Sequence, residues 1–147
     1  MKALENNDNS IGYLLYHLTT ALQRSVKHQL DQLDITHTQF IILATTYRLS
    51  AQNQVVNQVD IAKQSQTDKM MVSKILRTLQ EKQLISRVDN TIDTRAKNIS
   101  ITPKGIEVFQ QAFVMVKQVE QQFFAALGAQ KQLFAEQLKT VLDNNQY

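Results

Sequence analysis

The sequence contains no cysteine, which excludes disulfide bonds, thiolate zinc sites and thiol-based redox switches within this chain. It has only one proline, Pro103, and three glycines, Gly12, Gly105 and Gly128. So few helix-breaking residues favour long helices over a β-sandwich with many turns. Hydrophobic residues make up 43% of the 147 residues, which is enough to build a folded core.

Other missing features exclude classes of function. No apolar run approaches the roughly 20 residues of a membrane span, and the first residues lack the apolar centre of a signal peptide, so we expect a cytoplasmic chain with no membrane partner. There is no glycine-rich phosphate loop, His-Glu metalloprotease pattern or nucleophile elbow. The histidines, His17, His28 and His37, are dispersed, and a metal site from His17 and His37 gains no support from carboxylate spacing. We expect no enzyme activity, no cofactor and no metal.

Positive charge is concentrated in the middle of the chain. Residues 63 to 104 hold nine lysines and arginines against four acidic residues, a net charge of +5, whereas the remainder carries −2. A basic centre between mildly acidic ends indicates a module that binds a polyanion, carried on a scaffold with another task. An ordinary lysine-rich surface is the alternative, and charge alone favours neither.

Helical periodicity dominates both ends of the chain. Residues 11 to 33 carry aliphatic side chains at steps of three and four, in a stripe wide enough to indicate contacts with a partner chain. Thr102 and Pro103 form a typical helix start, so we expect a long helix to about Leu127, a break at Gly128 and a last helix. The phenylalanines of this region are most simply explained as dimer core: Phe123, Phe124 and Phe134.

Between these ends the sequence predicts a helix-turn-helix followed by a β-hairpin. A short turn sets the second helix across the first, and its outer face then fits the DNA major groove, about 12 Å wide. The expected elements are a helix from the Thr36–Gln39 capping box to about Leu49, a very short strand at Val55-Val56, helices capped by Asn57 and Asp68 around the turn 65–67, and strands 84–88 and 98–101 joined by a polar loop.

The outer face of the second helix offers cations for phosphates and donors for base edges. Met70 and Met71 cannot share one face, and we expect Met71 toward the protein and Met70 toward DNA, against a thymine methyl group. The alternative, in which both methionines pack within the domain, fits the sequence equally well. Arg95 and Lys97 in the hairpin loop are suited to a minor groove or the backbone beside it. The cations and donors of the helix face are Lys69, Ser73, Lys74 and Arg77.

Three segments resemble the MarR family of transcriptional regulators: residues 61 to 85, the run Asp93-Thr94-Arg95-Ala96-Lys97, and the run Ser100-Ile101-Thr102-Pro103-Lys104-Gly105. The order and length of the flanking helices extend the resemblance to most of the chain. The resemblance implies a mainly α fold with a small β-hairpin, in which a winged helix-turn-helix domain, 36–102, lies between dimerisation regions 1–35 and 103–147. It also implies a homodimer with recognition helices in successive major grooves, Arg95 as the wing arginine and Asp93 as the acid that helps fix the wing tip.

Two positions depart from the family pattern. Gln83 stands where the family usually has glycine after the recognition helix, and a non-glycine residue in a left-handed conformation costs roughly 1 kcal/mol, so a different turn is an open alternative. Asp68 stands at the start of that helix, where serine is common, and its carboxylate would repel a phosphate. We therefore expect side-chain cations to bind the phosphates.

The resemblance also implies a pocket between the dimer helices and the reading domain. Tyr13, His17, His37 and Phe40 are candidates to line it around a small aromatic or anionic effector, although structural packing is the simpler interpretation for all four.

Together these observations predict a sequence-specific regulator that binds double-stranded DNA. We expect a ligand-responsive repressor that binds a pseudo-palindromic operator as a homodimer. The alternative is a winged helix that binds protein or RNA and has no operator. A steep salt dependence of duplex binding would favour the first.

Overall fold

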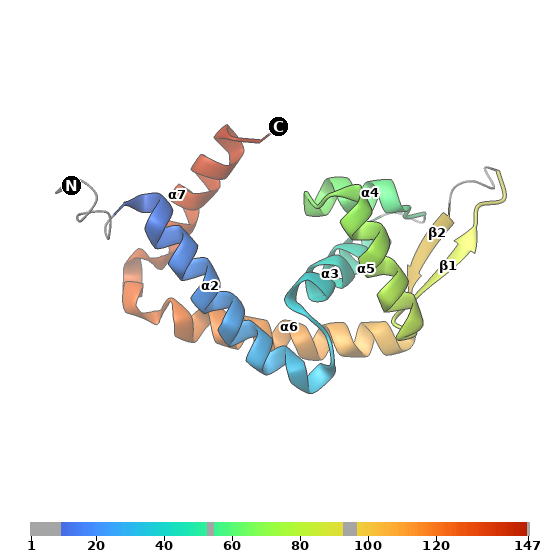
Figure 1. Cartoon of the computed structure of the whole chain (residues 1–147), viewed down its shortest axis with the longest axis horizontal. Helices are drawn as coiled ribbons and strands as arrows, with labels where there is room; N and C mark the ends of the chain where they lie inside the picture. Colours follow the sequence, from blue (N-terminus) through green and yellow to red (C-terminus); the bar gives the residue numbers. More distant parts are fainter. Residues whose placement is uncertain (1–9, 53–54, 93–96, 147) are drawn as a thin grey trace. The chain divides into compact units, whose positions relative to one another are not determined.

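The computed structural model describes residues 10–52, 55–92 and 97–146, and Figure 1 shows the course of the chain. The chain divides into two compact units, a central unit of Gln23–Val116 and a terminal unit of Met1–Leu22 with Lys117–Tyr147. The elements are α2 (Ile11–Leu30), η2 (Asp31–Leu33), α3 (His37–Gln52), α4 (Gln58–Ser65), α5 (Lys69–Glu81), β1 (Ile85–Asp89), β2 (Lys97–Ile101), α6 (Pro103–Phe123), η3 (Ala125–Gln130) and α7 (Lys131–Asn144).

The core of the central unit follows from the periodicity of its helices. Helix α5 buries Val72, Ile75, Leu76 and Leu79, which recur at steps of three and four and therefore lie on one face. They pack in a core with fully buried side chains from α2, α3 and α4. Each such aliphatic side chain contributes about 1.5–3 kcal/mol. The other fully buried members include Leu30, Ile42, Leu43 and Ile61.

Side chains cap the helices of the central unit as the sequence predicts. At α3, Thr36 Oγ1 accepts from the Gln39 N–H at 3.1 Å, and the Gln39 side chain accepts from the Thr36 N–H at 3.2 Å. At α4, Asn57 and Asp60 form the same reciprocal pair. At α6, Thr102 Oγ1 accepts from the Gly105 N–H at 3.0 Å. These starts are therefore fixed by local sequence.

The hairpin is a two-stranded antiparallel sheet in which Ile85 pairs with Ile101 and Asp89 with Lys97. The expected strand at Val55-Val56 is wrong: neither residue is in a strand. Among the described residues, one backbone hydrogen bond joins this segment to the hairpin, from the Ile99 N–H to the Val56 carbonyl at 2.8 Å. A single bond holds the buried Val56 in place but does not make a ladder.

Three helix ends differ from the expected ones. Helix α2 ends at Leu30 and passes into η2, which ends where Asp34 takes a left-handed conformation, φ 53°, and its N–H donates to the Asp31 carbonyl. Helix α3 continues to Gln52, beyond the expected end near Leu49. Helix α6 ends at Phe123, before Leu127, and the break expected at Gly128, φ 55°, falls within η3 instead.

The terminal unit leaves many apolar side chains exposed. Helix α7 has no buried residue, although Leu133, Leu138, Val141 and Leu142 lie along it. Phe124 contacts Phe123 and Phe134, with ring centroids 5.1 and 6.2 Å apart. An amphipathic helix with no covered face within its own chain is typical of an element that packs against a partner. Among the described residues, no helix is long and apolar enough to cross a membrane.

Candidate nucleic-acid interface

Helices α4 and α5 form the helix-turn-helix of the central unit (Figure 1). The turn between them is closed by Gln66, which adopts φ 52° and whose N–H donates to the Ala62 and Lys63 carbonyls. Ile61 and Ala62 anchor α4 in the core. The tight turn expected at residues 65–67 is therefore confirmed, and it fixes the angle at which α5 leaves α4.

Asp68 caps the N-terminus of α5 as expected. Its Oδ2 accepts from the backbone N–H groups of Met70 and Met71 at 3.0 and 3.2 Å. A carboxylate therefore occupies the terminal N–H groups that would otherwise attract a phosphate. Phosphate binding by α5 is left to the cationic side chains along it.

The exposed face of α5 carries the residues that the sequence singled out. Met70, Ser73, Lys74 and Arg77 follow one another at i, i+3, i+4 and i+7, opposite the buried stripe, and Lys69 is exposed beside them. Met70 is 81% exposed, which overturns the alternative that both methionines pack inside the domain.

Met71 is less exposed than Met70 but is not buried. It is 50% exposed and lies one residue before the fully buried Val72. It thus lies at the edge of the apolar face and is not part of the core.

Lys69, Lys74 and Arg77 differ from the other described cations of the basic segment except Lys63. In the part of the chain that the structure describes, none of these three forms an ion pair with a carboxylate. Other cations of the segment are engaged by the protein itself, as Arg87 Nε donates to Gln80 Oε1 at 2.7 Å. The unpaired charges are thus concentrated on α5. The engaged lysines are Lys82, Lys97 and Lys104.

The hairpin brings Lys97 to the start of β2, where its Nζ lies 3.5 Å from Asp89 Oδ1 on β1. Both side chains are exposed, so this ion pair is weak and leaves Lys97 available to another anion. Asp93 and Arg95 lie outside the described residues, and their roles at the wing tip stay predictions.

The turn after α5 is left-handed at Gln83, although the residue is not glycine. Gln83 adopts φ 63°, so the left-handed turn is present without glycine. The Leu84 N–H donates to the Leu79 carbonyl at 2.9 Å, and Thr102 Oγ1 donates to the Gln83 carbonyl at 2.7 Å. These bonds keep the turn in place despite its strain.

The four candidates for an effector pocket fall into two pairs. Tyr13 and His17 belong to the terminal unit, with ring centroids 4.3 Å apart. His37 and Phe40 belong to the central unit, with centroids 6.4 Å apart. Phe40 is buried and also stacks on Phe109, which indicates a packing role for it. A pocket shared by the two pairs stays a prediction.

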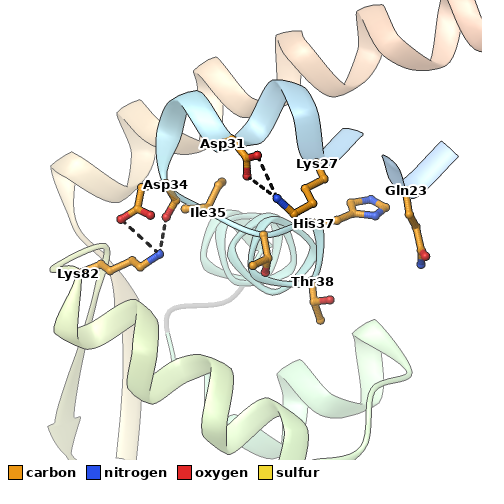
Figure 2. A pocket seen from close by; sticks show the side chains of 9 residues that line it. Gln23, Lys27, Asp31, Asp34, Ile35, His37, Thr38 and Lys82 are labelled. Atoms are coloured by element: carbon orange, nitrogen blue, oxygen red, sulfur yellow. Dashed lines mark hydrogen bonds and ion pairs between the residues drawn. The ribbon is translucent and has the colours of Figure 1, made fainter. Parts of the chain in front are cut away.

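Sequence reasoning did not find a hollow of about 380 Å³ within the central unit, at the start of α3. Figure 2 shows Lys27 bonded to Asp31 on one side of it and Lys82 bonded to Asp34 on the other. Lys27 and Asp31 are one helical turn apart, whereas Lys82 and Asp34 are 48 residues apart, and only the folded chain reveals that second contact. Among the described residues there is no cluster of three or more histidine, aspartate or glutamate side chains that could hold a metal ion.

Comparison with known proteins agrees with this geometry. Residues 31–120 match the family model described as ArnR1-like, winged-helix domain. The HTH-type transcriptional regulator YdcH of Bacillus subtilis (strain 168) is 37% identical over 135 residues, which are 92% of this chain and 91% of that protein.

Two solved structures are similar over nearly their whole length. The S. aureus MepR–DNA complex is 29% identical with a TM-score of 0.83, and the match covers 92% of this chain and 98% of MepR. A cysteine-to-serine mutant of MarR from E. coli, complexed with operator DNA, has a TM-score of 0.78 at 24% identity, with 93% and 97% covered. At this low identity, the likeness to MarR supports the fold alone.

Proposed function

The chain belongs to the MarR family of winged helix-turn-helix transcriptional regulators, and on that premise we propose that it represses transcription by binding a pseudo-palindromic operator as a homodimer. One observation supports this most: on the exposed face of α5, Lys69, Lys74 and Arg77 have no carboxylate partner among the described residues, and they lie beside the donor Ser73. Cations without internal partners release the counterions of DNA when they meet phosphates, and this release drives binding.

The role of each contact follows from its place on α5. Residues near the N-terminus of a recognition helix reach base edges, so Met70 and Ser73 are assigned to the bases. Lys74 and Arg77, further along the helix, are assigned to phosphate or guanine. Lys97 and Arg95 of the wing are assigned to the minor groove or the adjacent backbone.

The exposed apolar side chains of the terminal unit support the homodimer. In a dimer with two-fold symmetry, the two recognition helices meet successive major grooves when they stand about 34–36 Å apart. The operator is then an approximate inverted repeat. A small aromatic or anionic effector would lower operator affinity if it binds more tightly to a dimer whose recognition helices stand at another separation. The loss of operator affinity equals the difference between the effector's affinities for the two forms of the dimer.

The experiment is a footprint on the DNA upstream of the protein's own gene, followed by titration of the protected duplex at several salt concentrations. We expect protection of an inverted repeat and a steep loss of affinity with added salt. Sedimentation of the free protein should show a dimer.

A monomeric protein, or duplex affinity that does not respond to salt, would contradict the proposal. Either result would favour the second candidate, a winged helix that binds protein or RNA. Repeating the footprint with phenolic compounds tests the effector: release of the DNA is expected if one of them is a ligand.

A further inference from the structure

Lys82, directly after α5, is a lysine of the basic segment whose ammonium group points into the protein. Its Nζ donates to the backbone carbonyl of Asp34 and, at 3.3 Å, to Gln39 Oε1. Asp34 Oδ2 lies 3.8 Å away (Figure 2). The Lys82 side chain is only 28% exposed. The ammonium group of Lys82 is thus bonded to acceptors of the central unit.

The bonds of Lys82 connect two distant segments. On one side is the C-terminal end of α5, and on the other is the corner formed by η2 and the start of α3. The Asp34 carboxylate is 96% exposed, so its ion pair contributes little. The carbonyl of Asp34 and the part-buried side-chain oxygen of Gln39 are therefore the principal partners, because charge-assisted hydrogen bonds are stronger than a solvated ion pair.

Two hollows border this connection. Lys82 and Asp34 both line the hollow of about 380 Å³ at the start of α3 and a second hollow of about 330 Å³ that also borders Leu84 and Lys104. The lysine side chain therefore borders both hollows. Where side chains do not interdigitate, packing does not fix the distance between elements, and a polar bridge has a larger share in fixing it.

The backbone of Lys82 is held as well. Its carbonyl accepts from Lys104 Nζ at 3.2 Å, and the neighbouring Gln83 carbonyl accepts from Thr102 Oγ1 at 2.7 Å. The start of α6 therefore anchors the same end of α5. Lys82 is then the link from this anchored end to the corner before α3.

We propose that Lys82 is a positioning residue, which holds the C-terminal end of the recognition helix at a fixed distance from the corner at Asp34 and does not contact DNA. The effect of Lys82 on operator binding rests on the proposed function. The distance that Lys82 fixes between the end of α5 and the corner at Asp34 does not. Small displacements of a recognition helix matter because both copies must match two half-sites at once.

The first test measures the distance without DNA. Since the chain has no cysteine, Glu81→Cys and Gln32→Cys, both exposed, accept spin labels cleanly in the full-length protein. Labelled protein is diluted into excess unlabelled protein, so that distances within one chain are read. We expect a narrow distance distribution for the native chain and for Lys82→Arg, and a broader or shifted one for Lys82→Met. An unchanged distribution in Lys82→Met would overturn the proposal even if the protein binds its operator.

The second test separates positioning from phosphate contact. We expect Lys82→Met to weaken operator binding by about tenfold, as for the loss of one charge-assisted bond, with the salt slope unchanged and the preference for half-site spacing relaxed. Lys82→Arg should restore both, and Asp34→Asn, which keeps the carbonyl, should behave as the native chain.

The salt slope is the slope of log affinity against log salt concentration. If it is smaller in magnitude by about 1 in Lys82→Met than in the native chain, the lysine contacts a phosphate and the proposal is overturned. A thermal melt of each variant gives the folded fraction. If Lys82→Met is unfolded, Lys82→Gln, which is too short to span the same distance, replaces it in both tests. No operator binding by the native chain would contradict the proposed function, while the label distances would still decide the role of Lys82.

Discussion

Gly105 at the start of α6 lies directly against the backbone carbonyl of Leu84: a Cβ on Gly105 would stand 2.0 Å from that oxygen and 2.8 Å from Ile101 Cγ1. The glycine is required by this close approach and not by an unusual backbone conformation, since its φ is not positive. It lets the first turn of α6 pack on the base of the hairpin. The position of the wing relative to α6 therefore depends on the absence of a side chain here.

We expect Gly105→Ala to lower the free energy of unfolding by about 1–3 kcal/mol, because backbone has to shift to admit the methyl group. Urea unfolding followed by circular dichroism measures it. Gly12→Ala is the matched control, since a Cβ at Gly12 meets nothing within 4 Å, and its stability should be unchanged or slightly higher. Equal stability of the two variants would show that the contact at Leu84 relaxes without cost.

Gln83→Gly should stabilise the protein. Gln83 is held at φ 63°, which costs a side-chain-bearing residue roughly 1–2 kcal/mol, whereas glycine loses roughly 0.5–1 kcal/mol of unfolded-state entropy. The expected gain is therefore about 0.5–1 kcal/mol, read as a higher urea midpoint with an unchanged slope. Gln64→Gly, within helix α4, is the control and should lose about 1 kcal/mol. A loss of stability in Gln83→Gly would mean that the glutamine side chain contributes a contact that outweighs the strain.

Lys74→Ala and Arg77→Ala should each weaken duplex binding and lower its salt slope by about 1 if the side chain meets a phosphate. If either reads a base, the expected loss is about 1–3 kcal/mol at the native operator and smaller at unrelated DNA. Lys131→Ala on α7 is a control of equal charge change outside the basic segment. Similar losses in all three variants would indicate a general effect of net charge and contradict the assignment to α5.

The local sequence was enough to predict the parts of the fold that local chemistry determines. The caps at Thr36, Asn57 and Asp68 and the buried stripe of α5 each need only neighbours within one or two turns, and all are confirmed. The corner at Asp34 could not be predicted in this way. Asp34 ends η2 in a left-handed conformation, and its carbonyl accepts from Lys82, which lies 48 residues away.

The division of the basic segment into unpaired and engaged cations could not be predicted either. Lysine and arginine count equally in a sequence, whereas in the structure Lys82 and Arg87 donate hydrogen bonds to other residues of the chain and Lys74 and Arg77 are exposed. The charge pattern therefore predicted the basic segment but not which of its lysines and arginines are left without internal partners.

Met70 provides a test of base recognition that needs no change of charge. In the major groove only thymine offers a methyl group, and an 81% exposed methionine on the stripe of Ser73 and Lys74 is suited to contact it. Replacing the contacted thymine by uracil removes one methyl group and should weaken binding by about 0.8 kcal/mol, roughly fourfold. In Met70→Ala the same replacement should have little effect, because the partner is already gone, while Met71→Ala should keep the native response. Loss of affinity on uracil replacement that is equal in the native chain and in Met70→Ala would assign the thymine methyl to another residue.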